Sequence, residues 1–593
     1  MKPQTRPVSP KCSVADQPVP DDLRAAPARW SGLRHFAKEP LLLAIVVLAA
    51  VALFVVPLGA VGRLAFFATG GGVEAFSAAL SNRSVQRALW HSLESAALAA
   101  ALAVLLGGGL GLLIGLTDIR GRVALSFAIL MLLMIPPHVT AIAWMQMLGP
   151  SSVLLQMLGA APPLGSTNPL YSREGVIALL ALQQVPIVYL TLRAALRAFP
   201  RDLAEAARVS GAGPWLLLRR VILPVMGPAF LAGYALAFVS ALGNFGVPAL
   251  LGIPGRYVTL PVLMWQRLAS SGPSVLADLA VLATLIGAVA VVAVWGQMRL
   301  SRAMSVALIG AAQQPLRLRL GRARPFVEAG LWTLLMLLVV APMLAMLATA
   351  VVPTYGVPLG PDTVTFRHFH EVIFTQSVTA RAFANSAGLA LAAGIGVATL
   401  ALAVGALLRG PLSAGVRSVT MLAEIAYAVP GLVISIAFII AFIKPLPVLG
   451  ISLYGTHAII LGAYLSAFLA IGLKPVGVAF AALDPALQEA ARVSGAGFWR
   501  RLWRIDLPLI APAAASGAVL VMLTAWNEVT LSSILWTRGT ETLGTVIFNY
   551  EDGGYSTLAS AMSIISVLAT LALMLVLHWF GRNLPPGIIP WRG

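Results

Sequence analysis

Charged residues are scarce in this chain. Only 10% of its 593 residues are Asp, Glu, Lys or Arg, whereas soluble globular proteins carry about 25%. Hydrophobic residues make up 59% of the sequence, and the mean hydropathy is +0.89. Such a composition needs lipid as its solvent, because too few polar side chains remain to cover the apolar ones in water. It therefore excludes a soluble domain of any size and predicts a membrane protein with many spans.

Cysteine is almost absent, and lysine is rare. The single Cys12 lies in the polar N-terminal segment and cannot form an internal disulfide. No Cys and His residues are spaced as the ligands of a structural zinc site. None of the lysines stands in a Gly-x-x-x-x-Gly-Lys-Ser/Thr loop, so the sequence contains no Walker A site for ATP. We therefore expect this chain to bind neither a cofactor nor a metal.

Acidic residues are few as well: 22 Asp and Glu stand against 40 Lys and Arg, and the formal net charge is +18. The basic residues fall in short loops between apolar runs, which argues against nucleic-acid binding. If the N-terminus is cytoplasmic, 30 of the 40 basic residues lie in cytoplasmic segments. The positive-inside rule therefore predicts that both termini are cytoplasmic.

Twelve apolar runs are long enough to cross a bilayer as helices, so the expected fold is all-α. Residues 1–39 precede them and are expected to form a disordered cytoplasmic tail. Six runs make a first domain at 40–298, a basic cytoplasmic linker follows at 299–328, and six runs make a second domain at 329–593. The runs lie at about 40–61, 91–116, 123–148, 175–196, 229–250, 275–297, 329–352, 384–408, 418–442, 455–478, 513–535 and 556–579.

Nine consecutive residues, Glu-Ala-Ala-Arg-Val-Ser-Gly-Ala-Gly, occur twice, beginning at Glu205 and at Glu489. A Leu-Pro pair follows each copy at the same distance. Each copy lies between the fourth and fifth runs of its domain, in a predicted cytoplasmic loop. Because each domain has an even number of spans, both enter the membrane in the same direction. The sequence thus predicts a parallel repeat about an axis along the membrane normal.

Each copy predicts a short helix, a sharp turn at glycine and a return to the membrane at proline. Gene duplication explains the two copies, but it does not explain why nine loop residues stayed identical while the spans diverged. Small alanine side chains also let another protein approach closely. We therefore predict two docking loops for a cytoplasmic partner, formed by Glu205, Ala206, Ala207 and Gly211 in the first copy and Glu489, Ala490, Ala491 and Gly495 in the second.

The whole pattern resembles the EAA loop of binding-protein-dependent ABC importer permeases. The second copy matches through Ile505 and Leu507, and the first departs only in having Val221 at the aliphatic position. The resemblance implies the type I ABC importer fold in a bacterial inner membrane. It also implies that the loops are coupling helices seated in two copies of a cytoplasmic ATPase, which bind ATP and Mg²⁺. A periplasmic binding protein would deliver the substrate, and this chain would be a non-catalytic subunit.

Fusion of two six-span halves resembles the iron(III)-type permeases and the related thiamine and phosphorylated-compound permeases. The segments Asn-Phe-Gly-Val-Pro-Ala-Leu-Leu from Asn244 and Asn-Glu-Val-Thr-Leu-Ser-Ser-Ile-Leu-Trp from Asn527 also resemble the iron(III)-type group. The resemblance favours ferric iron as the substrate. It leaves thiamine and phosphorylated organic compounds as alternatives.

Polar residues inside apolar runs are costly and usually face a pathway or a partner. Carboxylate and phenol oxygens suit a hard cation, although they also attract an organic cation. Each such residue can instead be paired within the helix bundle. The candidate pathway residues are Glu424, Glu528, Asn244, Asn527, Tyr427 and His138, with Glu94 as a further carboxylate.

Two other functional classes fit the sequence less well. An ion-coupled secondary transporter needs no ATPase contact, and many such transporters use inverted repeats. A membrane anchor or sensor has no use for two symmetric docking loops. We therefore predict an importer that alternates between two open states and is coupled to its ATPase through Glu205 and Glu489.

Overall fold

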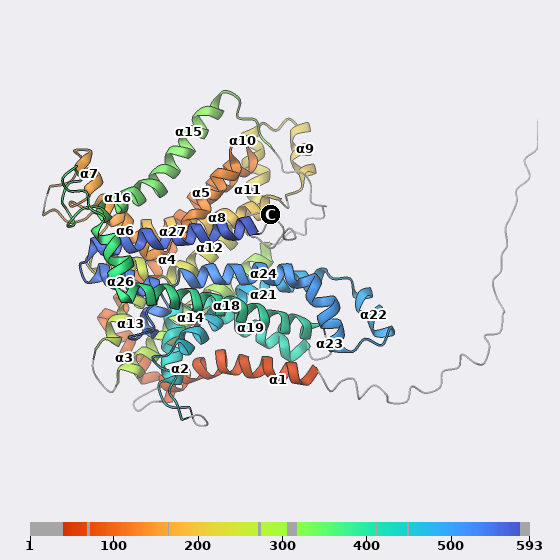
Figure 1. Cartoon of the computed structure of the whole chain (residues 1–593). Helices are drawn as coiled ribbons and strands as arrows, with labels where there is room; N and C mark the ends of the chain where they lie inside the picture. The colour runs from red at the N-terminus through yellow and green to blue at the C-terminus, as the bar shows by residue number, and fades with distance from the viewer. Residues whose placement is uncertain are drawn as a thin grey trace, which may run out of the picture.

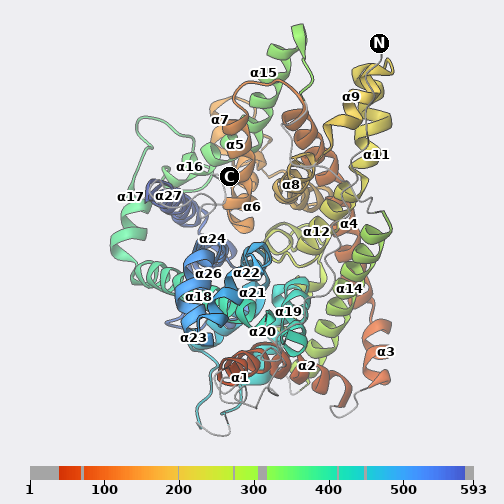
Figure 2. The same ribbon diagram turned by 90° about the vertical axis from the view of Figure 1, so that its right-hand side faces the viewer.

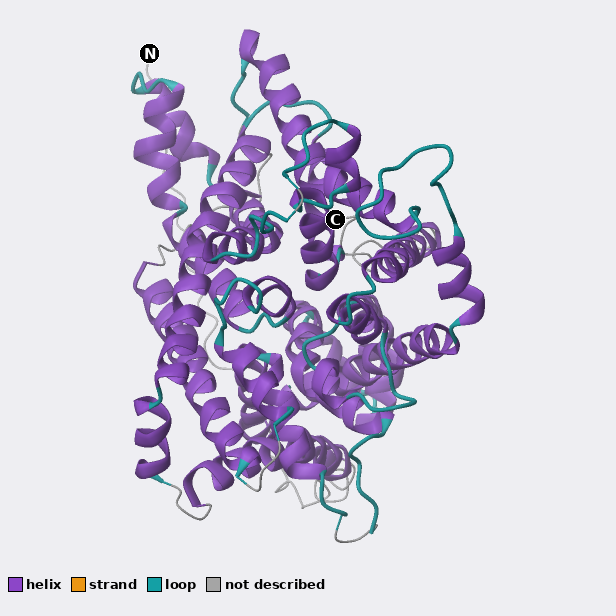
Figure 3. Ribbon diagram, turned by 90° about the vertical axis from the view of Figure 1, so that its left-hand side faces the viewer, coloured by secondary structure: helices purple, strands orange, loops and turns teal. Residues whose placement is uncertain are grey.

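The structure, a computed structural model, describes residues 39–67, 72–163, 165–197, 199–270, 274–304, 317–409, 413–446 and 450–580. The predicted tail at 1–39 falls outside these residues except for Glu39. Figure 3 shows helices joined by loops throughout the described part of the chain. The all-α prediction is therefore confirmed.

Within the described residues, nine helices are long and apolar enough to cross a membrane, and three bent helix pairs raise the number to twelve. Each of the twelve overlaps one predicted run. The first half contains α1 (Glu39–Ala50), α2 (Val56–Phe67), α4 (Arg83–Leu116), α5 (Arg122–Met134), α6 (Pro137–Leu148), α8 (Arg173–Arg197), α12 (Gly227–Leu242) and α14 (Val275–Met304). The second half contains α15 (Arg324–Leu335), α16 (Ala341–Ala350), α18 (Ser377–Leu408), α19 (Ser413–Ala428), α20 (Gly431–Phe442), α21 (His457–Ala482), α24 (Leu507–Trp526) and α27 (Ser556–Phe580).

Short helices lie at the two ends of the bundle (Figure 1). One end carries α3 (Val73–Ser81), α7 (Val153–Met157), α13 (Leu260–Leu268) and α26 (Leu543–Asp552). The opposite end, called the loop end below, carries α9 (Arg201–Val209), α10 (Pro214–Leu217), α22 (Pro485–Val493) and α23 (Phe498–Arg501). Three further short helices are α11 (Leu223–Val225), α17 (Arg367–His370) and α25 (Ser532–Leu535).

The third span of each half is broken in its middle. The axes of α5 and α6 meet at 100°, and those of α19 and α20 meet at 114°. Pro136 and Pro430 stand at the two breaks, where proline removes a backbone donor and disfavours a helical residue before it. The runs at 123–148 and 418–442 are therefore bent spans rather than the straight helices that their length suggests.

The fifth spans end earlier than their apolar runs. α12 ends at Leu242 and α24 ends at Trp526, whereas the runs continue to about 250 and 535. The chain leaves the helix at this point in both halves and turns back through short helical segments. The apolar character of these residues comes from burial in the protein, because 245–250 and 531–535 are all buried.

Matching contacts show that the two halves share one fold. Ser92 Oγ accepts a hydrogen bond from Leu260 N at 2.7 Å, and Ser386 Oγ accepts one from Leu543 N at 2.9 Å. The serines are 294 residues apart, as are Pro136 and Pro430 at the helix breaks. Residues of the fourth spans and docking loops correspond instead at a separation of 284, the spacing of the duplicated sequence.

The first span of each half packs against the other half. α1 and α2 contact α18, α19 and α20 of the second half, and α15 and α16 contact α5 and α6 of the first. Figure 2 shows these two exchanges on opposite sides of the bundle. The exchange ties the halves together through apolar surface, and it places each first span against the broken third span of the other half.

The segment between the halves is anchored to the first half. Leu318 pairs with the loop after α4, where Asp118 N donates to Leu318 O at 3.1 Å. Leu320 N donates to Asp118 Oδ1 at 2.9 Å, and Arg324 Nη1 lies 3.7 Å from Asp118 Oδ2. The hydrogen bond from Leu320, followed by the charge of Arg324, lowers the pKa of the Asp118 carboxyl. Helices α14 and α15 extend into the predicted linker at 299–328, whose residues 305–316 lie outside the described part.

Helix α4 packs closely against α8 at Gly107, and substitution of this glycine tests the contact. A Cβ atom on Gly107 of α4 would lie 2.5 Å from the carbonyl oxygen of Val185 on α8, whereas one on Gly109 would meet nothing within 4 Å. Gly107→Val should therefore destabilise the α4–α8 contact by about 1–3 kcal/mol, and Gly109→Val should not. Thermal unfolding of both variants in detergent checks this expectation. Equal midpoints for the two variants would contradict the packing described here.

Candidate functional site

The duplicated sequence forms two matching helices, α9 and α22, at the loop end of the bundle (Figure 1). The side chains of Glu205 and Glu489 are exposed. Val209 and Val493, the last residues of the two helices, are each 90% exposed. The two predicted docking loops thus lie on the same side of the molecule, although Ala491, one of the predicted docking residues, is buried.

Each of the two helices ends at a left-handed glycine. The backbone φ is +83° at Gly211 and +74° at Gly495, values that cost a residue with a Cβ atom roughly 1–2 kcal/mol. The N–H of the residue after each glycine donates to a carbonyl oxygen five positions earlier, that of Ala207 in the first loop and Ala491 in the second, at 2.9 Å in both. The glycines therefore fix the direction in which the chain leaves each helix.

Apolar side chains remain exposed on both docking loops. Leu203 and Leu487, at equivalent positions of α9 and α22, are 41% and 46% exposed, and Trp215 beyond α9 is 72% exposed. With Val209 and Val493, equivalent positions of the two loops therefore expose the same kind of apolar side chain.

The two loops are attached to the bundle differently. In the second loop, Asp484 caps α22 by accepting a hydrogen bond from Ala486 N at 2.9 Å, and Arg409 Nη2 donates to Leu483 O at 2.7 Å. In the first loop, Pro200 precedes α9 without a side-chain cap. Apolar burial of Phe199, Ala204 and Leu217 holds that loop instead. The docking geometry is the same although the anchoring residues are not.

A cavity of about 540 Å³ lies between the halves. Residues of α12 and α14 line it from the first half, and residues of α19, α20 and α21 line it from the second. Three of the predicted pathway residues, Glu424, Tyr427 and Glu528, are among its lining residues.

Lys474 also lines this cavity, although it was not among the predicted pathway residues. Its Nζ lies 3.8 Å from Glu424 Oε2 and 4.9 Å from the centre of the Tyr427 ring. Both members of the ion pair are about half exposed to the cavity or its surroundings. Lys474 is the one lysine inside a predicted span. That position could have singled it out, because a charge in a span is costly without a partner or a passage.

Glu528 lines the cavity and also accepts hydrogen bonds from backbone N–H groups. Its carboxylate accepts hydrogen bonds from Leu531 N at 2.7 Å and Ser532 N at 3.1 Å. It therefore satisfies the free N–H groups at the start of α25. These bonds give Glu528 a structural role, whereas Glu424 is paired with Lys474 alone among the described residues.

The two asparagines connect structural elements. Asn244 Nδ2 donates to Gln183 Oε1 at 3.1 Å, and Asn244 Oδ1 accepts a hydrogen bond from Val247 N at 3.2 Å. Asn527 Nδ2 donates to the carbonyl oxygen of Met134, the last residue of α5 in the other half, at 3.1 Å. Neither is among the lining residues of the cavity. Their contacts shape the interface between the halves rather than the passage itself.

His138 and Glu94 lie away from the cavity. His138 is fully buried, and a Cβ atom on Gly246 would lie 3.2 Å from the His138 Cβ. Glu94 forms an ion pair with Arg173 at 2.5 Å and accepts a hydrogen bond from Tyr257 at 2.9 Å. The structure therefore places only three of the six main pathway candidates together, at one cavity.

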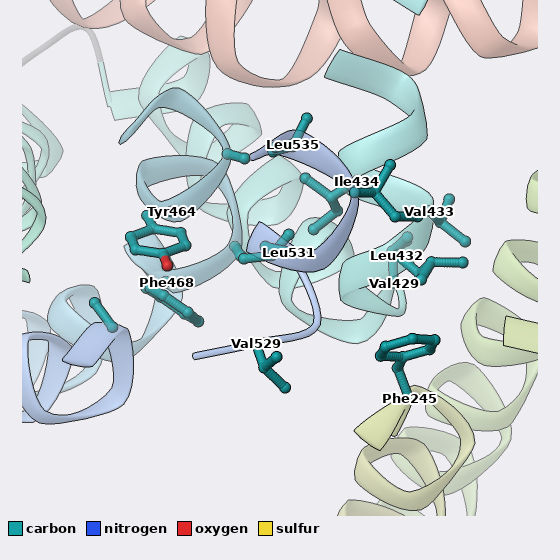
Figure 4. Packing of buried hydrophobic residues seen from close by; sticks show 14 of the residues in the cluster. Phe245, Val429, Leu432, Val433, Ile434, Tyr464, Phe468, Val529, Leu531 and Leu535 are labelled. Carbon is teal, nitrogen blue, oxygen red and sulfur yellow. The ribbon is translucent and has the colours of Figure 1, made fainter. Parts of the chain in front are cut away.

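An aromatic cluster lies beyond this cavity, on the side of α13 and α26. The ring centres of Phe245 and Trp265 are 5.7 Å apart, and that of Phe548 lies 5.4 Å and 5.9 Å from them. Phe548 belongs to the second half and the other two to the first. Figure 4 shows Phe245 beside Val429 of the opposite half. The halves thus meet in packed apolar side chains at this level.

Comparison with known proteins identifies the repeat. Residues 107–306 and 398–590, about two thirds of the chain, match the family described as the binding-protein-dependent transport system inner membrane component. The probable ABC transporter permease protein y4fN of Sinorhizobium fredii is 26% identical, over 89% of this chain and 92% of that protein.

Relatives with named substrates differ from one another. The ferric transport system permease protein FbpB of Actinobacillus pleuropneumoniae is 23% identical, over 79% of this chain and 68% of its own length. The putative 2-aminoethylphosphonate transport system permease protein PhnU of Salmonella choleraesuis is 29% identical, over 38% of this chain and 80% of its own length. The ferric relative thus aligns over more than half of this chain and the phosphonate relative over less than half.

The contacts of the two cavity carboxylates predict different effects on stability. Glu528→Ala removes the acceptor for two backbone N–H groups and should destabilise the protein by about 1–3 kcal/mol. Glu424→Ala removes a half-exposed ion pair and should change stability by less than about 1 kcal/mol. Thermal unfolding in detergent measures both effects. A smaller loss for Glu528→Ala than for Glu424→Ala would refute the structural role of Glu528.

Proposed function

We propose a function from one premise: this chain belongs to the family of binding-protein-dependent transport system inner membrane components. Members of this family are ABC transporter permeases that work with an ATPase and a substrate-binding protein. On this basis the chain is a multi-pass inner membrane protein and a transport subunit without catalysis of its own. The proposal adds the direction of transport, the coupling sites and the substrate.

The coupling sites are the two loops of α9 and α22, each seated on one copy of the ATPase. Their support is geometric: two copies of one exposed helix and glycine turn stand at the same end of the bundle. ATP and Mg²⁺ bind to the ATPase subunits, and this chain binds no cofactor. The loop end is therefore the cytoplasmic end, which agrees with the positive-inside prediction for both termini.

The cavity between the halves is the proposed passage. The aromatic cluster around Phe245 closes the passage on the periplasmic side in this state. A binding protein docks there, at the end that carries α3, α7, α13 and α26. Closure of the ATPase dimer draws the two coupling loops together, which reorients the halves and moves substrate inward.

Ferric iron is the proposed substrate. One observation carries this choice: the ferric relatives align with this chain across both halves, at 79% and 73% of its length. The carboxylate of Glu424 and the phenol of Tyr427 supply the oxygen donors that a hard cation favours. Their role is contact during passage, because the binding protein supplies most of the selectivity.

A phosphorylated organic compound is the second candidate. Lys474 places a positive charge in the same cavity, and an ammonium group suits a phosphate or phosphonate oxygen. The phosphonate relative supports this alternative over 38% of this chain. Thiamine is the remaining alternative. Its support is the resemblance of this fused chain to the thiamine permeases.

Uptake in cells tests the substrate. In a strain deleted for this gene, uptake of radioactive ferric iron should fall to background and return with the wild-type gene. Uptake should persist when the proton gradient is collapsed at constant ATP, because the driving force is ATP. Unchanged iron uptake together with lost uptake of 2-aminoethylphosphonate would replace the first substrate by the second. If uptake instead stops when the proton gradient is collapsed at constant ATP, the protein is a secondary transporter.

Two glycines of the second loop provide a matched test of coupling. Gly495→Pro is incompatible with φ of +74° and removes the hydrogen bond from Gly495 N to Arg492 O. Gly497→Pro is the control, because φ at Gly497 is already −66°. Gly495→Pro should abolish transport and reduce co-purification of the ATPase at least tenfold, while membrane insertion stays normal. Full transport by Gly495→Pro would refute the docking role of the loop.

A further inference from the structure

A second large groove lies on the first half, away from the proposed passage. It has a volume of about 960 Å³ and lies between α5 and α8 of the first half and α27 of the second. Phe127, Leu190 and Leu575 are among its lining residues and are 39%, 38% and 68% exposed. Because these helices cross the membrane, the exposed apolar walls face lipid rather than water.

The groove is basic at one end. Arg193 and Arg197 line it from the last turns of α8, and His578 lines it from the last turns of α27. Arg197 also interacts with another group of the protein. Four residues after Arg197, α9 begins. The basic end therefore lies at the loop end of the membrane, next to the first coupling loop.

A smaller cavity of about 400 Å³ adjoins this basic end, and the two share Gly121 and Val123. Arg122, Arg317 and Arg324 line the smaller cavity, together with the single carboxylate of Asp118. Positive charge therefore exceeds negative charge around the mouth of the groove. A field of this kind attracts an anionic group at the membrane surface.

The equivalent cavity of the second half is the proposed passage, and different residues line it. Leu130 and Leu190 of the groove correspond to Glu424 and Lys474 of the proposed passage, at the separations of 294 and 284 residues. Each of the two cavities is lined by the third and fourth spans of one half and the last span of the other. The first half thus has apolar walls where the second half has a charged pair.

The basic residues at the end of the groove occur in the first half and have no basic counterpart in the second. Arg193 and Arg197 correspond to Gly477 and Ala481 of the second half. The arginines are therefore not a general feature of the repeat, since the second copy folds in the same way without them. An apolar groove that is open to lipid, with arginines added at its surface end, matches the two parts of a phospholipid.

We propose that this groove binds one anionic phospholipid, with its acyl chains along α5, α8 and α27 and its phosphate against Arg193 and Arg197. The bound lipid joins the two halves, because α27 belongs to the second. It also steadies α8 immediately before the first coupling loop. An anionic lipid should therefore raise the ATPase activity of the assembled transporter.

Native mass spectrometry of the assembled transporter tests the proposal. The probes are phosphatidylglycerol and phosphatidylcholine, added in equal amounts after delipidation. The double variant Arg193→Gln and Arg197→Gln should bind phosphatidylglycerol about thirtyfold more weakly, because each arginine near a membrane surface contributes roughly fivefold and the two factors multiply. Arg417→Gln is the control for loss of an arginine outside the groove, since Arg417 is exposed near the start of α19 and occupies the position equivalent to Val123.

A second pair of variants tests the groove without changing charge. Leu575→Trp fills the groove, whereas Leu568→Trp places the same bulk on α27 at a residue that is 59% exposed and outside the groove lining. Of these two variants, only Leu575→Trp should lower the number of retained phosphatidylglycerol molecules. The proposal is overturned if all variants retain the lipid equally or if phosphatidylcholine binds as strongly. It is also overturned if a photoreactive group at Leu575 crosslinks to protein rather than lipid.

Discussion

A bilayer offers no water to an unpaired backbone group, and this constraint governs the centre of the molecule. Both third spans break there, so backbone carbonyl groups at the breaks lose their helical partners. At the first break the carbonyl oxygen of Met134 receives a hydrogen bond from Asn527 of the other half, at 3.1 Å. Because the partner comes across the interface, the broken spans and the contact between the halves depend on each other. Movement of the halves relative to each other would therefore act on this hydrogen bond at the first break.

The two halves share one fold because the sequence is duplicated. The residues that line their equivalent cavities differ. The serine contacts of Ser92 and Ser386, the breaks at proline and the glycine turns of the coupling loops are repeated. Side chains that face the two equivalent cavities are not repeated. The second half carries the charged pair of Glu424 and Lys474, and the first carries apolar walls. In the function proposed above, the common fold serves coupling through both loops, and the charged pair of the second half serves the passage.

The sequence predicted the twelve spans and the repeat, because apolar runs and identical residues are local signals. It did not predict the angle of the bends, since Pro186 and Pro475 lie inside unbroken helices while Pro136 and Pro430 stand at breaks. Packing decides between these outcomes. Likewise, the polar residues of the spans looked alike in sequence, but Glu528 caps α25 and His138 is buried. The exchange of first spans between the halves depends on long-range contacts that leave no periodic signal.

Coupling through the two loops requires that they move together when ATP binds. The most direct measurement is the distance between spin labels at Val209→Cys and Val493→Cys, in a Cys12→Ser background and in the assembled transporter. Both positions are 90% exposed, so labels fit without disturbing the fold. The account predicts that this distance shortens when ATP binds and returns after hydrolysis. A distance that stays the same in both states would contradict coupling through these loops.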